Sequence, residues 1–164
     1  MSGIRIRPAT EKDAAAISVI YNQGIEDRIA TLETELRTPE ERQRWLASRG
    51  PRHPVIVAEV TGTIVGWGSL NPFNPRPAYQ HVADFSIYVE RDWRGKGVGK
   101  RLLEALIEQA RKIGYHKMML SAFPFNQAGV ALYERMGFAT VGICHEMGLL
   151  DEKWTDTIIM EKLL

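Results

Sequence analysis

The sequence predicts a single α/β (α+β) domain with one mixed central sheet of about seven strands and about four flanking helices. Three strand-like segments follow one another through hairpin-length links, a pattern typical of an antiparallel meander. An amphipathic helix and a further strand come after the third segment, which is typical of a parallel βαβ unit. The full order, β-α-α-β-β-β-α-β-α-β-β, lacks the strict alternation of a doubly wound fold.

The N-terminal part of the chain is expected to form a short strand and two helices. Ile4–Arg7 alternates apolar and basic residues, as a half-buried strand does. Thr10 is followed three positions later by an acidic residue, which is a helix-capping pattern, and small or apolar residues recur along one side up to Gly24. Thr38 should cap a second helix, because proline and glutamate occupy its first and third positions, and this helix should end near Ser48.

The middle of the chain is expected to form three consecutive strands. Val55–Val60 and Ile64–Leu70 are rich in β-branched residues and flank a turn at Thr61-Gly62, so they are predicted to pair as a hairpin. Asn71–Tyr79 contains three prolines and is predicted to be a loop. Val82–Val89 is the third strand.

The second half of the chain is expected to continue with helices and strands. Asp92–Gly99 is a polar, glycine-rich turn. Val98–Ile113 has the apolar spacing of a helix, and Gly114 ends it. The remaining predicted elements are the strand Lys117–Ala122, the helix Gln127–Met136 and the strands Phe138–Cys144 and Trp154–Glu161.

Composition and charge are those of an ordinary globular chain, and its 164 residues fit one domain, 1–164. The formal net charge of +1 lacks the basic excess of a general nucleic-acid binder. No apolar run approaches the roughly 18 residues of a membrane span, and Met1–Arg7 carries no secretory signal. A lone cysteine, Cys144, can form no internal disulfide, so a cytoplasmic location without nucleic-acid or membrane partners is expected.

The most informative stretch runs from Asp92 to Arg101, between a predicted strand and a predicted helix. Glycines let successive backbone N–H groups converge on a phosphate, and the helix N-terminus adds partial positive charge. Basic side chains supply further counter-charge, so a diphosphate is the expected ligand. The candidate binding residues are Arg94, Gly95, Lys96, Gly97, Val98, Gly99 and Lys100.

Two other phosphate-binding motifs do not fit this stretch. A P-loop requires glycine where Arg94 stands, and serine or threonine where Arg101 stands. A dinucleotide-binding fingerprint requires glycine at the position of Lys100. A solvated glycine turn that binds nothing is the remaining alternative.

The motif Arg94-x-x-Gly97-x-Gly99 resembles the pyrophosphate loop of the GNAT superfamily of N-acetyltransferases, and Ala131–Phe138 resembles its C-terminal signature. The order of elements is similar to that superfamily over nearly the whole chain. The resemblance implies the GNAT fold, acetyl-CoA as cosubstrate, and direct attack by an amine within a ternary complex.

Three further stretches resemble one branch of the superfamily: Ile20–Ile25, Thr31–Glu35 and Asn71–Tyr79. That branch acetylates phosphinothricin and arsinothricin, methionine sulfone, methionine sulfoximine and L-amino acids. The resemblance therefore implies a small amino acid or amino-acid analogue as acceptor, a link to antibiotic resistance, and a homodimer.

The resemblance also implies two catalytic residues. Asp84 stands where the family usually has a glutamate general base, and its shorter side chain favours a water relay. The alternative is a strand-end aspartate that holds a neighbouring loop. Tyr133 resembles the tyrosine that protonates the departing CoA thiolate, although the branch often has histidine there. The alternative is a packed tyrosine with a satisfied hydroxyl.

Further cosubstrate contacts are implied on the third strand and at the last helix. Ile87, Tyr88 and Val89 should offer backbone groups to the pantetheine arm, and an N–H group there should stabilise the oxyanion. Asn126 resembles the asparagine that hydrogen-bonds this arm, and its position is equally that of a helix N-cap.

Acceptor recognition is implied in the proline-rich loop. Arg76 matches the second arginine of a pattern that grips acidic substrates, since a guanidinium can bind two oxygens at once. Asn74 replaces the first arginine of that pattern, and Leu32 replaces a phenylalanine in the motif that ends at Glu35. We expect these four residues to contact the acceptor. An exposed loop arginine is the alternative for Arg76.

Three functions remain open at this point: a small-molecule amine acetyltransferase, a protein N-terminal or lysine acetyltransferase, and a non-catalytic acyl-CoA-binding module. The prolines and Arg76 favour a closed, anion-seeking pocket, and Asp84 with Tyr133 favours catalysis. The histidines lack metal-ligand spacing, so no metal is expected. Phe123-Pro124-Phe125 is expected either to line the acceptor pocket or to pack beside a split between strands.

Overall fold

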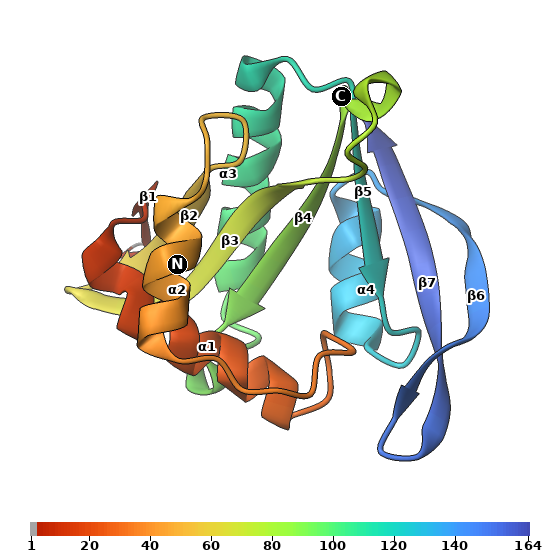
Figure 1. Cartoon of the computed structure of the whole chain (residues 1–164), viewed down its shortest axis with the longest axis horizontal. Coiled ribbons are helices and arrows are strands. Elements are labelled where there is room, and N and C mark those ends of the chain that lie inside the picture. Colours follow the sequence, from red (N-terminus) through yellow and green to blue (C-terminus); the bar gives the residue numbers. More distant parts are fainter. Residues whose placement is uncertain (1–2) are drawn as a thin grey trace.

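The computed structural model describes residues 3–164 and contains one seven-stranded mixed sheet with helices on both faces, so the predicted fold class is confirmed (Figure 1). Met1 and Ser2, which begin the predicted domain 1–164, lie outside the described residues. The strands are Arg5–Pro8 (β1), Val55–Val60 (β2), Thr63–Pro72 (β3), Val82–Val89 (β4), Lys117–Ala122 (β5), Ala139–Leu150 (β6) and Lys153–Leu163 (β7). The helices are Ala14–Glu26 (α1), Pro39–Ala47 (α2), Val98–Ile113 (α3) and Gln127–Arg135 (α4).

The sheet has the strand order β1-β2-β3-β4-β5-β7-β6. β1 to β4 form the predicted antiparallel meander. β4 and β5 run parallel because α3 crosses between them, whereas β5, β7 and β6 are antiparallel. The parallel contact therefore joins the two halves of the sheet at its centre.

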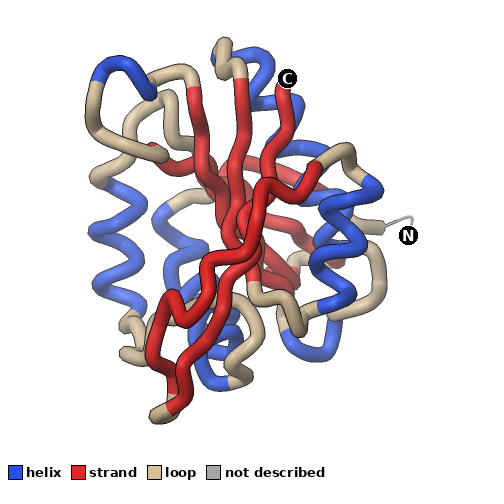
Figure 2. The backbone as a smooth tube through the Cα atoms, turned by 90° about the vertical axis from the view of Figure 1, so that its right-hand side faces the viewer, coloured by secondary structure: helices blue, strands red, loops and turns tan. Residues whose placement is uncertain are grey.

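Helices cover both faces of the sheet (Figures 1 and 2). α3 buries Leu102 and Leu106 in the larger hydrophobic core. α1 packs on the opposite face, where Ile17 meets Trp67 of β3. α3 can approach β3 closely because Gly66 has no side chain: a Cβ there would lie 2.9 Å from a methyl group of α3.

β4 and β5 are paired only over residues 82–84 and 117–119. Both strands continue beyond this stretch, to Val89 and Ala122, and Figure 1 shows them diverging. β3 pairs with the other edge of β4 from Ala83 to Val89. The sheet is therefore split on one side of β4, and α4 follows β5 directly beside this split.

The hairpin of β6 and β7 is longer than the sequence predicts. β6 continues to Leu150 rather than Cys144, and β7 reaches Leu163 rather than Glu161. Two register shifts, at residues 140–142 and 144–148, interrupt the alternation of inward and outward side chains. Because the expected strand pattern depends on unbroken alternation, these bulges hide the second half of β6.

Candidate active site

A pocket of about 410 Å³ lies at the end of β4, between the start of α3 and the start of α4. We call it the loop pocket. Backbone and apolar side chains form most of its wall. Its members include Arg94, Gly95, Gly97, Gly99 and Lys100 from the predicted phosphate loop, and Ile87, Tyr88 and Val89 from β4.

Gly97 shapes the loop pocket. It caps α3 in the left-handed conformation, with φ of 87°, which glycine adopts without steric cost. The leading N–H groups of α3 have no acceptor within the helix, and its first turn holds no acidic residue. A Cβ at Gly97 would meet no atom within 4 Å, so the space in front of these N–H groups is open. The arrangement fits a diphosphate, because both the N–H groups and the helix dipole attract an anion.

Arg94 is fastened to the end of α1 as well as to β4. Its Nη1 lies 2.7 Å from Oδ2 of Asp27, and its Nε donates to the carbonyl of Val89 at 3.4 Å. Arg91 binds both oxygens of the same carboxylate: its Nη2 donates to Oδ1 at 2.8 Å and its Nε donates to Oδ2 at 2.9 Å. Hydrogen bonds from Arg91 and then Arg94 lower the pKa of Asp27. The carboxylate of Asp27 thereby ties the phosphate loop to the end of α1.

The side chains of three predicted cosubstrate residues make contacts within the protein. The ammonium of Lys96 lies 5.2 Å from the ring centre of Trp93, and the side chain of Val98 is buried in the core. The ring of Tyr88 stacks on Trp67 at 5.1 Å between ring centres. Lys96 and Val98 do not line the loop pocket, so they can serve a ligand there only through the backbone of the loop.

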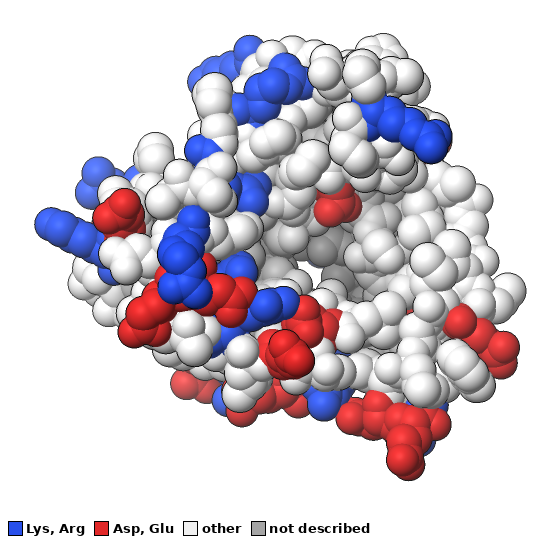
Figure 3. All heavy atoms as spheres, in the orientation of Figure 1, with Lys and Arg blue, Asp and Glu red and all other residues white. Residues whose placement is uncertain are grey.

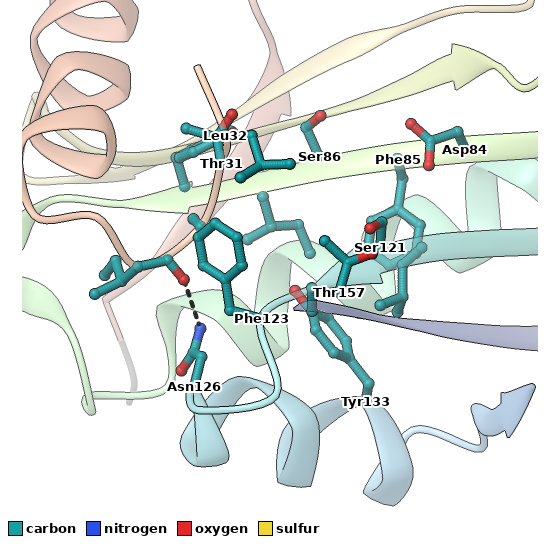
Figure 4. A pocket seen from close by; sticks show the side chains of 16 residues that line it. Thr31, Leu32, Asp84, Phe85, Ser86, Ser121, Phe123, Asn126, Tyr133 and Thr157 are labelled. Carbon is teal, nitrogen blue, oxygen red and sulfur yellow. Dashed lines mark hydrogen bonds between the residues drawn. The ribbon is translucent and has the colours of Figure 1, made fainter. Parts of the chain in front are cut away.

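A second cavity, of about 240 Å³, opens where β4 and β5 part, and we call it the inner cavity (Figure 4). Its wall comes from five segments: the loop 29–32 after α1, residues of β4, the end of β5 with its link to α4, Tyr133 of α4, and Thr157 of β7. Within residues 3–164, no arginine or lysine lines it. Figure 3 shows this face hollowed near its centre, with uncharged atoms to the right of the hollow and charged side chains at its lower left.

The two pockets share part of their walls, so ligands in them would meet. The shared residues are Ile29, Ala30, Ile87, Tyr88, Asn126 and Tyr133.

The loop 29–32, which covers the inner cavity, is held from two sides. The Nδ2 of Asn126 donates to the carbonyl of Ile29 at 3.3 Å, while its Oδ1 accepts from the N–H of Gly129 at 3.2 Å (Figure 4). Asn126 is therefore the N-cap of α4 and also a tie to this loop. Arg28 forms an ion pair of 2.9 Å with Asp151 in the turn between β6 and β7.

Asp84 is half-buried at the last position where β4 pairs with β5, and it lines the inner cavity. Burial raises the pKa of its carboxyl to about 6, although hydrogen bonds from the N–H of Phe85 and the side chain of Asn71 oppose the shift. A carboxylate with this pKa is ionised at neutral pH and remains basic enough to take a proton. Asp84 is thus suited to proton transfer, and it is the one acidic residue among the described residues of the cavity wall.

Tyr133 projects from α4 between the two pockets and lines both. Its ring packs edge-on against Phe85, with 5.9 Å between ring centres. Burial raises the pKa of its hydroxyl to about 12, so the group is protonated at neutral pH and can donate a hydrogen bond or a proton.

Three hydroxyl groups in the inner cavity carry no signal in the sequence. Ser86, Ser121 and Thr157 line it from β4, β5 and β7, and Figure 4 shows all three beside Asp84 and Tyr133. Thr157 is 4% exposed, and its Oγ1 has no hydrogen-bond partner among the described residues. These residues meet only because β7 lies beside β5, so no local pattern predicts them.

Of the four predicted acceptor residues, one lines the inner cavity and three lie outside its wall. Leu32 lines the inner cavity and packs on β6, where a Cβ at Gly148 would lie 2.6 Å from it. Glu35 and Arg76 are exposed and lie outside the cavity wall, as does Asn74. The Oδ1 of Asn74 accepts the backbone N–H of Arg76 at 3.0 Å and so shapes the loop.

Phe123 and Phe125, which flank Pro124, stack on each other at 4.9 Å between ring centres. Phe123 is buried and lines the inner cavity, whereas Phe125 is exposed. From the sequence, the segment is expected either to line the acceptor pocket or to pack beside a split between strands. The position of Phe123 fits the first expectation.

Within residues 3–164, no group of three or more His, Cys, Asp and Glu side chains has an arrangement that could hold a metal ion. No helix in the same range is long and apolar enough to cross a membrane.

Fold and site together fit a transferase, with room for a diphosphate-bearing cosubstrate at the start of α3 and for an acceptor in the inner cavity. The sequence profile of the acetyltransferase (GNAT) family matches residues 20–138. The chain belongs to this family, as the resemblance of its phosphate loop implied, and is accordingly an N-acetyltransferase.

Relatives match the chain over nearly its whole length. The L-methionine sulfoximine/L-methionine sulfone acetyltransferase of Pseudomonas paraeruginosa is 32% identical over 158 residues, which cover 95% of this chain and 92% of that protein. The crystal structure of ribosomal-protein-alanine N-acetyltransferase from Brucella melitensis superposes with a TM-score of 0.94 and 37% identity, covering 98% of this chain and 99% of that chain. The phosphinothricin acetyltransferase (Pat) of Sinorhizobium meliloti, solved in complex with AcCoA, has a TM-score of 0.92 and 28% identity, covering 99% and 89%.

Proposed function

We propose that this protein transfers the acetyl group of acetyl-CoA to the amine of a small amino acid or amino-acid analogue within a ternary complex. The observation that carries the proposal is the meeting of the loop pocket with the inner cavity, with Asp84 in one and the phosphate loop in the other. The inner cavity, at about 240 Å³, is close to the lower end of small-molecule sites, which begin at about 300 Å³. The relatives that act on methionine sulfoximine, methionine sulfone and phosphinothricin support this substrate class.

In the proposed mechanism, acetyl-CoA lies along the split edge of β4 with its diphosphate at the start of α3. Asp84 accepts a proton from the acceptor ammonium, directly or through water. The neutral amine then attacks the thioester carbonyl, and a backbone N–H of residues 87–89 stabilises the oxyanion. As the C–S bond breaks, the hydroxyl proton of Tyr133 passes to the thiolate. The surplus proton on the new amide nitrogen leaves to water, and Tyr133 takes up a proton from water. Holding both substrates in adjoining pockets supplies up to roughly 7–11 kcal/mol through positioning alone.

Arg76, Asn74, Glu35 and Leu32 complete the proposed acceptor site. Because no lysine or arginine lines the inner cavity in residues 3–164, an anionic acceptor needs a cation from outside its wall. Arg76 is exposed on the loop before β4, and its fork suits a carboxylate or phosphinate. Asn74 shapes the turn that carries it. Glu35 is exposed at the end of the motif that supplies Leu32.

A protein N-terminal acetyltransferase is the second candidate, because the Brucella melitensis structure is named for a ribosomal-protein-alanine activity. The covered inner cavity favours the small-molecule reading, since the tied loop 29–32 restricts entry of a peptide. The deciding experiment measures CoA release with phosphinothricin, methionine sulfone, a panel of L-amino acids, and peptides beginning with alanine. Acetylation of peptides alone would establish the second candidate instead.

We further propose that the protein is a cytoplasmic homodimer. It would inactivate toxic amino-acid analogues and thereby confer antibiotic resistance. The β6–β7 hairpin supports the dimer because it exposes a row of large apolar residues, of the kind that association would cover. These residues are Val141, Ile143, Met147, Leu149 and Trp154. Sedimentation at micromolar concentration should give twice the monomer mass of 18.6 kDa. Growth of cells expressing the protein on phosphinothricin tests the resistance.

A further inference from the structure

Arg49, which follows α2, is a half-buried cation that the mechanism above does not use. Its Nε donates to the carbonyl of His53 at 2.9 Å, and its Nη2 donates to the carbonyl of Leu70 and to Oδ1 of Asn71, the latter at 2.9 Å. Its guanidinium also lies 4.4 Å from the ring centre of Trp45. Among residues 3–164, Arg49 forms no ion pair within 4.0 Å with a carboxylate.

The contact with Arg49 determines which way the Asn71 amide points. A guanidinium can only donate hydrogen bonds, so the atom of Asn71 that faces it must be the carbonyl oxygen. Ser69, whose Oγ lies 3.0 Å from the same oxygen, does not impose this orientation, because a hydroxyl can either donate or accept. The NH₂ group of Asn71 must therefore face β4.

The NH₂ group of Asn71 meets the catalytic face of β4. Asn71 and Asp84 are directly opposite each other in the pairing of β3 with β4. The Nδ2 of Asn71 donates to Oγ of Ser86 at 3.1 Å, and the Asn71 side chain lowers the pKa of the Asp84 carboxyl. Since Ser86 already accepts this bond, its own proton is free to point into the inner cavity.

We propose that Arg49 is a positioning residue of the acceptor site: it fixes the Asn71 amide so that its NH₂ group faces Asp84 and Ser86. The inference rests on the proposed function of Asp84 as the base. The hydrogen bonds run in one direction towards the cavity: Arg49 donates to Asn71, and Asn71 donates to Ser86. Without Arg49 the amide can rotate, and its oxygen would then face the Asp84 carboxylate and repel it.

Asp84 is surrounded by few other titratable groups. Tyr133 of α4 and Tyr88 of β4 line the same cavity, and both are neutral at neutral pH because burial raises the pKa of each hydroxyl. Opposite Asp84 on β5 is Met119, which does not titrate. The hydrogen bond from Asn71 favours the charged form of Asp84, so its loss raises the pKa of that carboxyl.

The test measures the pKa of Asp84 by the carboxyl ¹³C shift in the full-length protein, which does not require Asp84 to be the base. Arg49→Met should raise this pKa by about 1 unit, since a hydrogen bond to a charged group is weakened. Arg49→Lys keeps a donor-only cation and should stay within about 0.3 unit of the parent. Arg44→Met, an exposed arginine on α2, is the matched control and should change nothing.

Two further variants separate positioning from general packing. Asn71→Ala should raise the pKa of Asp84, and adding Arg49→Met to it should cause no further rise, because Arg49 acts through Asn71. If Arg49→Met does not fold, Arg49→Gln also removes the donor-only constraint and should shift the pKa in the same direction. In catalysis, the acid limb of kcat/KM for the acceptor should move upward with the pKa, while the Kd of acetyl-CoA stays unchanged.

An unchanged Asp84 pKa in Arg49→Met, or equal shifts from Arg49→Met with and without Asn71, would overturn the inference. A separate outcome would show that Asp84 is not the general base, while leaving the role of Arg49 intact. If the pKa moves as expected but the acid limb of the parent survives in Asp84→Asn, then Arg49 positions Asp84 as inferred and Asp84 is not the base.

Discussion

The loop pocket and the inner cavity are neighbours that are built in opposite ways. The loop pocket takes its anion-binding groups from one continuous stretch, 94–100, and presents mainly backbone N–H groups. The inner cavity takes side chains from β4, β5 and β7, from α4 and the link before it, and from the loop after α1. A pocket made of backbone binds what all members of a family share, whereas one made of side chains can change its ligand by single substitutions.

The largest expected effect lies in the inner cavity. Asp84→Asn should lower kcat by about 1,000-fold, because the amide cannot take the proton of the acceptor amine. The parent rate should rise with pH through about 6, the pKa of Asp84, and this limb should disappear in the variant. Steady-state kinetics from pH 5 to 9 measure both.

Asp84→Asn, which should lower kcat, should at the same time increase the stability of the folded protein at neutral pH. The pKa of Asp84 is raised in the folded protein, so its contribution to stability is present below the unfolded pKa and lost as pH rises through about 6. Asp84→Asn should therefore increase Tm at pH 7 relative to the parent, with little difference at pH 4. A lower Tm at pH 7 would mean that the carboxylate holds the fold together and is not a strained catalytic group.

The next largest effect is expected in the loop pocket. Gly97→Val should weaken acetyl-CoA binding by about 300-fold, because valine disfavours the left-handed φ of 87° and its side chain enters the space before α3. Calorimetric titration measures this. Gly62→Val is the matched control, since Gly62 has φ of 82° and open surroundings in the turn between β2 and β3. Similar losses of binding in both variants would show that backbone strain, not the site, is responsible.

Tyr133→Phe tests the residue between the two pockets. The variant should lower kcat by about 100-fold, since the leaving thiolate loses its proton donor, and should leave the Kd of acetyl-CoA unchanged. Tyr115→Phe removes a hydroxyl that donates to the carbonyl of Arg52 at 2.9 Å, away from both pockets, and should keep the parent kcat. Equal turnover in the two variants would reduce Tyr133 to a packing role.

The smallest expected effect concerns the exposed loop. Arg76→Ala should raise the KM of phosphinothricin about tenfold, the change for loss of one charge-assisted contact, with acetyl-CoA binding unchanged. Methionine sulfone, which lacks the phosphinate, should be affected less. Unchanged KM values for both acceptors would exclude Arg76 from acceptor binding and leave recognition to the residues that line the inner cavity.

The sequence was informative where function depends on neighbours in the chain and uninformative where it depends on topology. Gly97 and the start of α3 could be located because a helix N-terminus after glycines is a local pattern. Thr157 could not, because its place in the inner cavity depends on β7 lying beside β5. Arg49 has no distinguishing pattern in the sequence. Its inferred role depends on the pairing of Asn71 with Asp84 between β3 and β4, which no local pattern predicts.

The parting of β4 and β5 gives this sheet an open edge in its interior, in addition to the edges at β1 and β6. Open strand edges are templates on which other chains can add, and proteins normally shield them. An acyl-CoA molecule lying along β4 would occupy this edge as a non-peptide strand. We therefore expect the empty protein to aggregate sooner on heating than the loaded one, so that the supply of acetyl-CoA governs the lifetime of the enzyme as well as its turnover.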